Sequence, residues 1–256
     1  MSPQTSTDTV KAEAGKHPLE ASVVECRTLS KHYGDVVAVD RISFSLEPGT
    51  VTGFLGPNGA GKTTTLRLLL GLAQPTSGDA LVFGRRYREL EHPLRQVGAV
   101  LESSDYHPSR SGRDHLRSLA LAADLPPSRV EEVLELVELR NAAGRRVRTY
   151  SLGMRQRLGV AAALLGDPDL LVLDEPSNGL DPAGVRWLRT FLRGLAAKGR
   201  SVLVSSHLLA EVAQTVDQVL IIDHGRLLAQ GSLNELTGTG QTLEDVYLEL
   251  TEGEPA

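Results

Sequence analysis

The chain has a single cysteine, Cys26, and no long apolar run among its 256 residues. One cysteine cannot form a disulfide within the chain, so we expect a reducing, cytoplasmic setting. No stretch approaches the roughly 18 to 20 apolar residues that a membrane-spanning helix needs. The first twenty residues are polar and lack the apolar centre of a secretion signal. We therefore expect residues 1–21 to be a disordered N-terminal tail and the protein to stay inside the cell.

A basic excess is also missing, because 27 Lys and Arg stand against 32 Asp and Glu, a net charge of −5. Binding to nucleic acid through its phosphates usually needs a clearly basic surface, so we expect no nucleic-acid partner. The histidines show no metal-ligand spacing, which argues against a zinc site. The length and the 41% hydrophobic content predict one α/β domain with room for an inserted subdomain.

The segment "GPNGAGKTT" lies between the apolar strand "VTGFL" and the apolar helix "LRLLLGL". Its spacing fits G-x-x-x-x-G-K-[ST], a loop whose backbone N–H groups surround phosphates at a helix N-terminus. Lys62 is expected to reach the β- and γ-phosphates, and the Thr63 hydroxyl to bind Mg²⁺. The predicted nucleotide-binding residues of this loop are Gly56, Pro57, Asn58, Gly59, Ala60, Gly61, Lys62, Thr63 and Thr64.

The pattern around this loop predicts three regions. Residues 23–46 alternate between apolar and polar residues and contain turn signals, which indicates antiparallel strands. Residues 111–165 look helical, with Ser128 and Glu131 predicted to form a capping box. The aliphatic run at 169–174 indicates a buried parallel strand, and "SVLVSS" and "QVLIID" indicate two more.

Two further segments carry chemistry. The aliphatic strand ends at Asp174 and Glu175, where α/β sheets place their sites. Asp174 could hold Mg²⁺ through water and Glu175 could orient or deprotonate the attacking water. "YSLGMRQRLGVAAALL" predicts a helix whose N-terminus, at Ser151 and Gly153, is a second anion site, although Ser151 could simply be its N-cap.

The ordered set of motifs resembles the ATP-binding subunit of an ABC transporter over roughly residues 22–236. "GPNGAGKTT" matches Walker A, "SLGMRQ" the signature motif, "LLVLDE" Walker B and "NGLD" the D-loop. The resemblance also matches His207 to the switch histidine and Tyr33 to the aromatic residue that stacks on adenine. Asp181 and Pro182 in the D-loop match a helix start as well.

The resemblance implies a P-loop NTPase of ABC ATPase type. Its α/β fold would combine a mostly parallel core sheet, an N-terminal antiparallel β-subdomain, an α-helical subdomain inserted at about 103–165 and a short extension at 237–256. It also implies a head-to-tail homodimer in which Ser151 and Gly153 of one copy, with Asp181 nearby, cap the ATP held by the other. His207 would contact the γ-phosphate.

Two departures from the usual pattern matter. Glu102 stands where most relatives carry glutamine, and as an anion it could still approach Mg²⁺. Leu152 stands where glycine is common in the signature. Together with the ending "TLEDVYLELT", these features resemble the bacitracin and daunorubicin type of drug-exporter ATPase.

The resemblance implies a peripheral motor at the cytoplasmic face of the membrane that powers export through a separate membrane-spanning subunit. The stretch from Glu102 to Leu119 would be the docking region. Two alternatives remain open: an ABC-type ATPase acting on ribosomes or DNA, and an importer motor. The acidic charge and the lack of a second cassette or long coiled coil count against the former. The short stretch after Leu236 counts against the latter.

Overall fold

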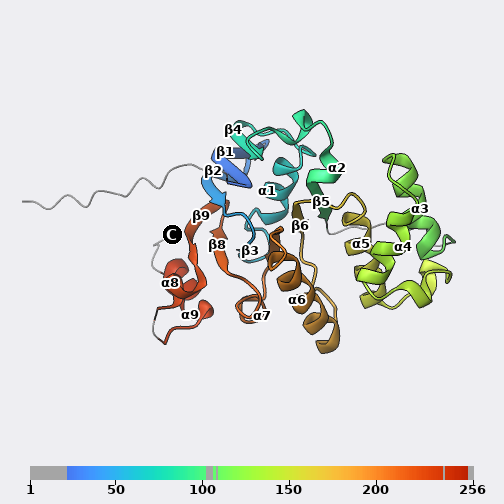
Figure 1. The fold of residues 1–256 in the computed structure, drawn as a ribbon. Helices are drawn as coiled ribbons and strands as arrows, with labels where there is room; N and C mark the ends of the chain where they lie inside the picture. Colours follow the sequence, from blue (N-terminus) through green and yellow to red (C-terminus); the bar gives the residue numbers. More distant parts are fainter. Residues whose placement is uncertain (1–21, 102–105, 108, 239, 253–256) are drawn as a thin grey trace, which may run out of the picture.

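The computed structural model describes residues 22–101, 106–107, 109–238 and 240–252. The predicted tail at 1–21 and the candidate ligand Glu102 therefore lie outside the described residues. Figure 1 shows a central sheet with helices on both faces, a small sheet beside it and a group of helices at one end. This confirms the predicted α/β fold.

The central sheet has the strand order β5-β6-β7-β3-β8-β9. Neighbouring strands are parallel from β5 through β8, and β9 pairs antiparallel with β8 at the edge. The strands are β3 (Val51–Leu55), β5 (Val97–Val100), β6 (Leu170–Leu173), β7 (Ser201–Ser206), β8 (Gln218–Asp223) and β9 (Arg226–Ser232). Strands β3, β6 and β7 are buried along their whole length, as expected where helices or a second sheet cover both faces. Edge strand β9, which is only half-buried, was not predicted.

The two faces of this sheet belong to two apolar cores. Because side chains alternate along a strand, Val51 and Leu55 face one core, while Phe54 faces the other. Phe54 packs at 5.9 Å, centroid to centroid, against Phe44 of the small antiparallel sheet. That sheet has the order β2-β1-β4 and confirms the N-terminal β-subdomain. Its strands are β1 (Val24–Tyr33), β2 (Val36–Leu46) and β4 (Ser77–Val82).

Cys26 lies inside the core that joins the small sheet to the central one. Its side chain is 2% exposed. Burial, with a smaller contribution from Glu25, raises the pKa of the Cys26 thiol far above its usual range. The thiol is therefore protonated and acts as a small apolar side chain in this core.

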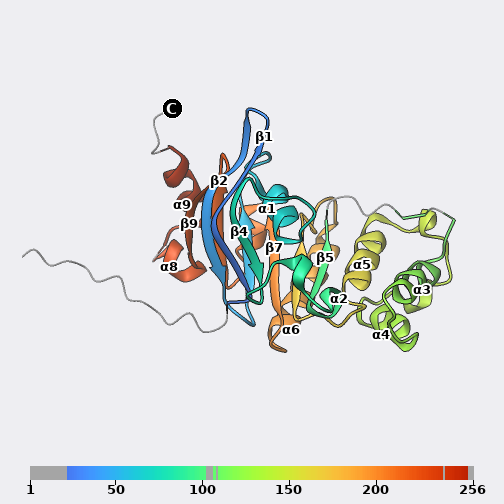
Figure 2. The same cartoon turned by 90° about the horizontal axis from the view of Figure 1, so that it is seen from above.

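The helical subdomain stands at one end of the molecule, as Figures 1 and 2 show from two directions. It contains α3 (Gly112–Ala122), α4 (Ser128–Leu136) and α5 (Leu152–Ala163), which pack through their apolar faces. The predicted capping box on α4 is wrong. Ser128 is already the first helical residue after Pro127, and Glu131 instead pairs with Arg113 at 2.7 Å. This ion pair fixes α4 to α3 and lowers the pKa of Glu131.

The remaining helices cover the central sheet or its edge. They are α1 (Lys62–Leu69), α2 (Pro93–Gln96), α6 (Pro182–Ala196), α7 (Leu209–Val212), α8 (Leu233–Thr237) and α9 (Leu243–Glu252). Helix α6 buries Leu188 and Leu192, while Trp187 is only partly buried and stacks on Phe191 at 5.2 Å. Within the described part of the chain, no helix is long and apolar enough to cross a bilayer.

Candidate nucleotide site

The glycine loop joins the end of β3 to the start of α1. Helix α1 begins after Gly61, which has a φ of 103° and provides no side-chain cap. A Cβ on Gly56 would lie 2.1 Å from the Ile222 carbonyl oxygen, and one on Gly61 would lie 2.4 Å from the Ala38 carbonyl oxygen. Because backbone packs this closely, only glycine fits at these two positions. The loop borders a cavity of about 290 Å³.

The Lys62 side chain is buried beside the loop, with 6% exposure. Its ammonium donates hydrogen bonds to the Gly56 carbonyl at 2.7 Å and to the Pro57 carbonyl at 3.1 Å. It also lies 3.2 Å from Glu175 Oε1. That oxygen is buried and accepts no hydrogen bond from the described residues, so it meets the Lys62 ammonium as an ion pair. The sheet thus brings together a lysine and a carboxylate 113 positions apart in the chain.

Asp174, at the end of β6, is 2% exposed, and both of its carboxylate oxygens accept hydrogen bonds. Its Oδ2 accepts a hydrogen bond from Thr63 Oγ1 at 2.8 Å, and its Oδ1 accepts one from Ser205 Oγ at 2.5 Å. Its backbone N–H donates to the Val100 carbonyl at 2.8 Å. The hydroxyl of Thr63 and the carboxylate of Asp174 therefore form a small set of hard oxygen atoms at the start of α1.

These oxygens fit Mg²⁺, which prefers oxygen ligands and usually binds one or two carboxylates together with substrate phosphates. No group of three or more His, Cys, Asp or Glu residues suited to a metal occurs among the described residues. The phosphates of a bound nucleotide would have to complete such a site.

Glu175 and His207 form a pair at the ends of neighbouring elements. His207 Nδ1 lies 2.8 Å from Glu175 Oε2, and Ser205 Oγ accepts a hydrogen bond from the Glu175 backbone N–H at 2.9 Å. Glu175 has a positive φ of 47°, which is strained for a residue with a side chain. Its carboxylate thus has Lys62 on one oxygen and His207 on the other, in a position where a water or phosphate could be oriented.

Other candidate residues lie apart from this group. Tyr33 is 49% exposed at the end of β1, with the Lys31 ammonium 4.7 Å from its ring centroid. Ser151 caps α5 by accepting a hydrogen bond from the Met154 N–H at 3.2 Å. Asp181 caps α6 by accepting one from the Gly184 N–H at 2.8 Å. Ser151 and Asp181 are exposed.

Ser205 is a site residue that the sequence analysis missed. It connects the Asp174 carboxylate to the Glu175 backbone. The available signal was the pair of polar residues that ends the otherwise aliphatic segment "SVLVSS". Its role becomes visible only when the sheet order places β7 beside β6, with Leu173 opposite Val204.

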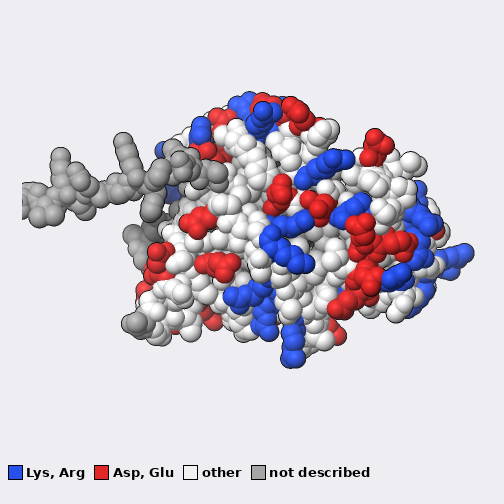
Figure 3. Space-filling model, in the orientation of Figure 1, with Lys and Arg blue, Asp and Glu red and all other residues white. Residues whose placement is uncertain are grey.

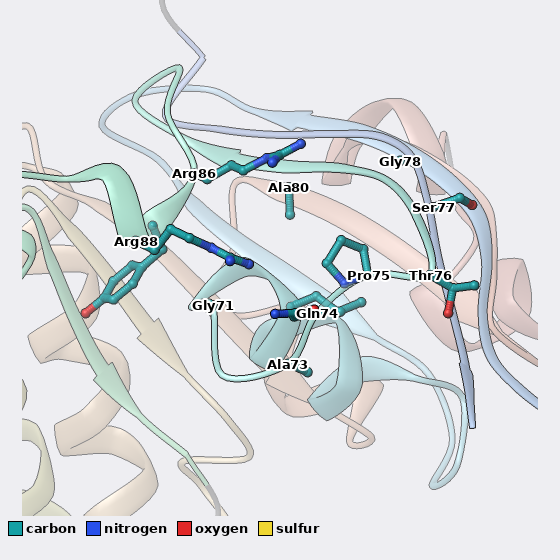
Figure 4. A pocket seen from close by; sticks show the side chains of 12 residues that line it. Gly71, Ala73, Gln74, Pro75, Thr76, Ser77, Gly78, Ala80, Arg86 and Arg88 are labelled. Atoms are coloured by element: carbon teal, nitrogen blue, oxygen red, sulfur yellow. The ribbon is translucent and has the colours of Figure 1, made fainter. Parts of the chain in front are cut away.

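A cavity of about 320 Å³ lies away from these residues, between the end of α1, β4 and the turn after it (Figure 4). Arg86 and Arg88 border it, and Arg86 is paired with Asp79. None of the predicted site residues lines this cavity. Figure 3 shows basic and acidic side chains interspersed over one face of the molecule.

The fold and the glycine loop define a P-loop nucleotide-binding domain, and the comparisons with known proteins specify its family. Residues 39–178 match the ABC transporter family. The chain is 42% identical over 210 residues to the uncharacterized ABC transporter ATP-binding protein YhcH of Bacillus subtilis, covering 81% of this chain and 69% of that protein. It is 40% identical over 217 residues to the bacitracin transport ATP-binding protein BcrA of Enterococcus faecalis, covering 84% of this chain and 70% of that protein.

A solved structure of an ATP-binding subunit of an ABC transporter superposes with a TM-score of 0.80 at 29% identity, over 90% of this chain and all of that one. The chain therefore belongs to the ABC transporter family, as an ATP-hydrolysing, ATP-binding subunit.

Proposed function

We propose that this subunit binds ATP with Mg²⁺, dimerises head to tail around two ATP molecules and powers export through a separate permease at the cytoplasmic face of the membrane. The observation that carries the proposal is the convergence of Lys62 and Thr63 of α1 with Asp174 and Glu175 at the end of β6. It joins a phosphate-binding loop to two carboxylates suited to metal binding and water activation.

In this proposal the glycine loop binds the phosphates through the N–H groups of residues 56–64. Lys62 exchanges its contacts with the Gly56 and Pro57 carbonyls for the β- and γ-phosphates. Thr63 and Asp174 hold Mg²⁺, which would stabilise negative charge on the transferred phosphate. Tyr33 stacks on the adenine ring. Glu102 remains a candidate for approach to the metal on sequence grounds alone.

Glu175 is proposed to orient or deprotonate the attacking water. Its hydrogen bond with His207 fixes the carboxylate, and His207 would also contact the γ-phosphate once a nucleotide is bound. The hydrogen bond from the Glu175 backbone N–H to Ser205 Oγ holds the Glu175 backbone in place. The roles of Glu175 and His207 both require their side chains to lie close together, which happens because the carboxyl ends of the parallel strands β6 and β7 meet at one edge of the sheet.

Dimerisation is supported by the exposure of the second set of residues. Ser151 and Asp181 stand at exposed helix starts, and nothing within 3.5 Å would oppose a Cβ on Gly153. In the proposed dimer they would cap the ATP held by the glycine loop of the other copy. Two donor surfaces would then share the phosphate charge and hold the interface until hydrolysis.

The permease contact is proposed near Leu119, the end of the predicted docking stretch. Leu119 borders a mostly apolar cleft of about 300 Å³ between the helical subdomain and the core. Leu94 and Ala99 line it from the core side, and Ala122 and Leu125 from the helical side. Leu94 is 48% exposed and Leu119 is 39% exposed, so a short amphipathic segment could bury both.

Export is favoured by the similarity to a bacitracin transport ATP-binding protein, and we propose drug, antibiotic or lipid-like cargo on this basis. An importer motor and an ATPase acting on ribosomes or DNA are the alternatives. Co-expression with a membrane protein encoded beside this gene would separate a transporter motor from an ATPase acting on ribosomes or DNA. Co-purification with a multi-span protein favours a transporter, and co-purification with ribosomes favours the alternative.

The decisive experiment is Glu175→Gln, which removes the charge and keeps the shape. We expect ATP binding to persist, turnover to fall at least about 100-fold and an ATP-dependent dimer to accumulate. Size-exclusion chromatography with ATP and Mg²⁺ and a phosphate-release assay measure both effects. A variant that stays monomeric and hydrolyses ATP at the parent rate would overturn the assignment.

A further inference from the structure

The start of α5 packs against the turn between β6 and α6. A Cβ on Gly179 would lie 2.5 Å from Leu152 Cδ2. A Cβ on Gly153 would lie 3.7 Å from Leu180 Cδ2. Each segment therefore contributes a leucine that lies beside a glycine of the other segment, and this double contact joins two parts of the chain 27 positions apart.

The two leucines differ in how deeply they are buried. Leu180 is partly buried against the core that contains α5. Leu152 is 51% exposed, and together with Asp174 and Glu175 it borders a cavity of about 250 Å³. Because Leu180 also contributes to this core, Leu152 is the residue whose removal tests the contact between the two segments with the least effect on folding.

The turn beside Leu152 joins Glu175 to Asp181. Within it the Asn178 N–H donates a hydrogen bond to the Glu175 carbonyl at 3.2 Å. Gly179 follows with a φ of 69°, a conformation that glycine adopts freely, and it has no side chain to anchor it. Among the described residues outside the turn, only Leu152 has atoms within 4 Å of the place where a Gly179 Cβ would stand. The position of the turn therefore depends on Leu152.

Ser151 and Asp181 are the exposed helix caps next to this contact. Ser151 directly precedes Leu152 and caps α5, and Asp181 comes two positions after Gly179 and caps α6. In the proposed dimer both caps face the nucleotide held by the other copy. The contact of Leu152 with Gly179 thus fixes the two caps relative to each other within one subunit.

We propose that Leu152 is a positioning residue that holds the turn at Gly179, and with it Asp181, against the start of α5, so that both caps meet the ATP of the other copy as one surface. The inference rests on the proposed head-to-tail dimer. Leu152 touches no phosphate in this proposal. Its loss should therefore loosen the turn and weaken ATP-dependent dimerisation, without weakening nucleotide binding by the single subunit.

The first test is Leu152→Ala, which keeps a good helix former at the start of α5 and removes the contact with Gly179. Hydrogen–deuterium exchange of the nucleotide-free subunit should become faster in residues 176–184. In the Glu175→Gln background, the ATP-dependent dimer dissociation constant, from analytical ultracentrifugation, should rise at least about threefold, as expected when the contacts of a half-buried leucine are lost.

Titration of Leu152→Ala with a fluorescent ATP analogue should give unchanged affinity at concentrations where the subunit is monomeric. Leu136→Ala is the matched control, because this leucine of α4 is 47% exposed and thus comparable to Leu152. It should change neither the exchange of residues 176–184 nor the dimer dissociation constant.

Gly179→Ala tests the contact from the other side. The added methyl group must displace Leu152 Cδ2 and is also strained at this positive φ. The strain is the same in the Leu152→Ala background, so it cancels when the effects of Gly179→Ala in the two backgrounds are compared. We expect Gly179→Ala to raise the dimer dissociation constant by a factor at least about threefold smaller in the Leu152→Ala background. Gly199→Ala, whose φ of 82° is also positive but whose Cβ would meet nothing within 4 Å, should instead be additive with Leu152→Ala.

Four outcomes would overturn the inference. Unchanged exchange in residues 176–184 would mean that Leu152 does not hold the turn, and a weaker dimer would then reflect direct contact with the other copy. Faster exchange with unchanged dimerisation would mean a merely structural role. Additive effects of Leu152→Ala and Gly179→Ala would mean that the two residues act separately. These three outcomes leave the proposed function intact, whereas failure of Glu175→Gln itself to dimerise with ATP would overturn the proposed sandwich, and the positioning role with it.

Discussion

Helices α1 and α5 both begin with segments suited to anions, but they begin in different ways. Gly61 precedes α1 without a side-chain cap, whereas Ser151 caps α5 through its own hydroxyl. Neither helix has an acidic residue in its first turn, so the positive end of each helix dipole is not neutralised there. The start of α1 leaves its N–H groups uncapped, while the start of α5 is already partly satisfied by its own chain.

The glycines of these two segments also differ, in how closely other atoms are packed around them. A Cβ on Gly61 would meet the Ala38 carbonyl oxygen at 2.4 Å, in a backbone conformation that disfavours side chains. A Cβ on Gly153 would meet nothing closer than Leu180 Cδ2 at 3.7 Å. Gly61 must be a glycine because of the backbone packed against it. Gly153 has no such constraint within the described chain, which favours a role in contact with another molecule.

The largest expected effect comes from Gly61→Ala. The added methyl forces backbone apart and holds alanine at a φ of 103°. We expect the free energy of unfolding to fall by more than about 2 kcal/mol, with nucleotide binding lost as the loop distorts. Chemical denaturation and ATP titration measure this. Gly59→Ala is the matched control, since its φ is also positive but nothing lies within 4 Å of its Cβ. Equal losses in both variants would contradict the close-packing argument.

Lys62→Ala should have the next largest effect. The substitution removes the buried ammonium that we expect to contact the phosphates, so nucleotide affinity should fall about 10- to 100-fold, as for a lost charge-assisted hydrogen bond. Isothermal titration calorimetry with ATP and Mg²⁺ provides the measurement. Lys198→Ala, in the exposed turn after α6, serves as the control. If Lys62→Ala binds ATP as tightly as the parent does, the lysine has no part in phosphate binding.

The sequence predicted local features better than distant ones. The strand, loop and helix around Gly56 and Lys62 were predictable because the pattern is contiguous and each residue type has a local reason. The buried strand β6 was predictable from its aliphatic run. Strand β9 was missed because its half-buried edge position leaves a mixed pattern, and the α4 cap failed because Glu131 is taken by Arg113.

Contacts between residues far apart in the chain were the least predictable. The link from Ser205 to Asp174 spans 31 positions and depends on the order of β6 and β7. The bond from Tyr106 to Arg155 spans 49 positions and depends on how the helical subdomain packs. Neither has a sequence spacing that a local pattern could reveal. Only the family resemblance could suggest that Ser151 and Gly153 act together with the glycine loop, and that role stays a prediction.

Gly153→Ala should have the smallest effect on the isolated subunit and is the sharpest test of the comparison. Glycine within a helix is less favourable than alanine by up to about 1 kcal/mol, and the open space beside Gly153 admits a methyl group. We therefore expect the free energy of unfolding to stay the same or rise slightly, and the affinity of the monomer for ATP to be unchanged.

In the dimer the same methyl group would stand between the α5 N-terminus and the phosphates of the other copy. Steady-state hydrolysis should then fall even though folding and nucleotide binding are intact, and Glu175→Gln/Gly153→Ala should fail to form the ATP-dependent dimer. Gly194→Ala, the same change at a glycine of α6 whose added Cβ would meet nothing within 4 Å, controls for general effects of the substitution. If Gly153→Ala hydrolyses ATP and dimerises as the parent does, then the α5 start does not approach the nucleotide, and the difference between the two helix starts reflects local packing alone.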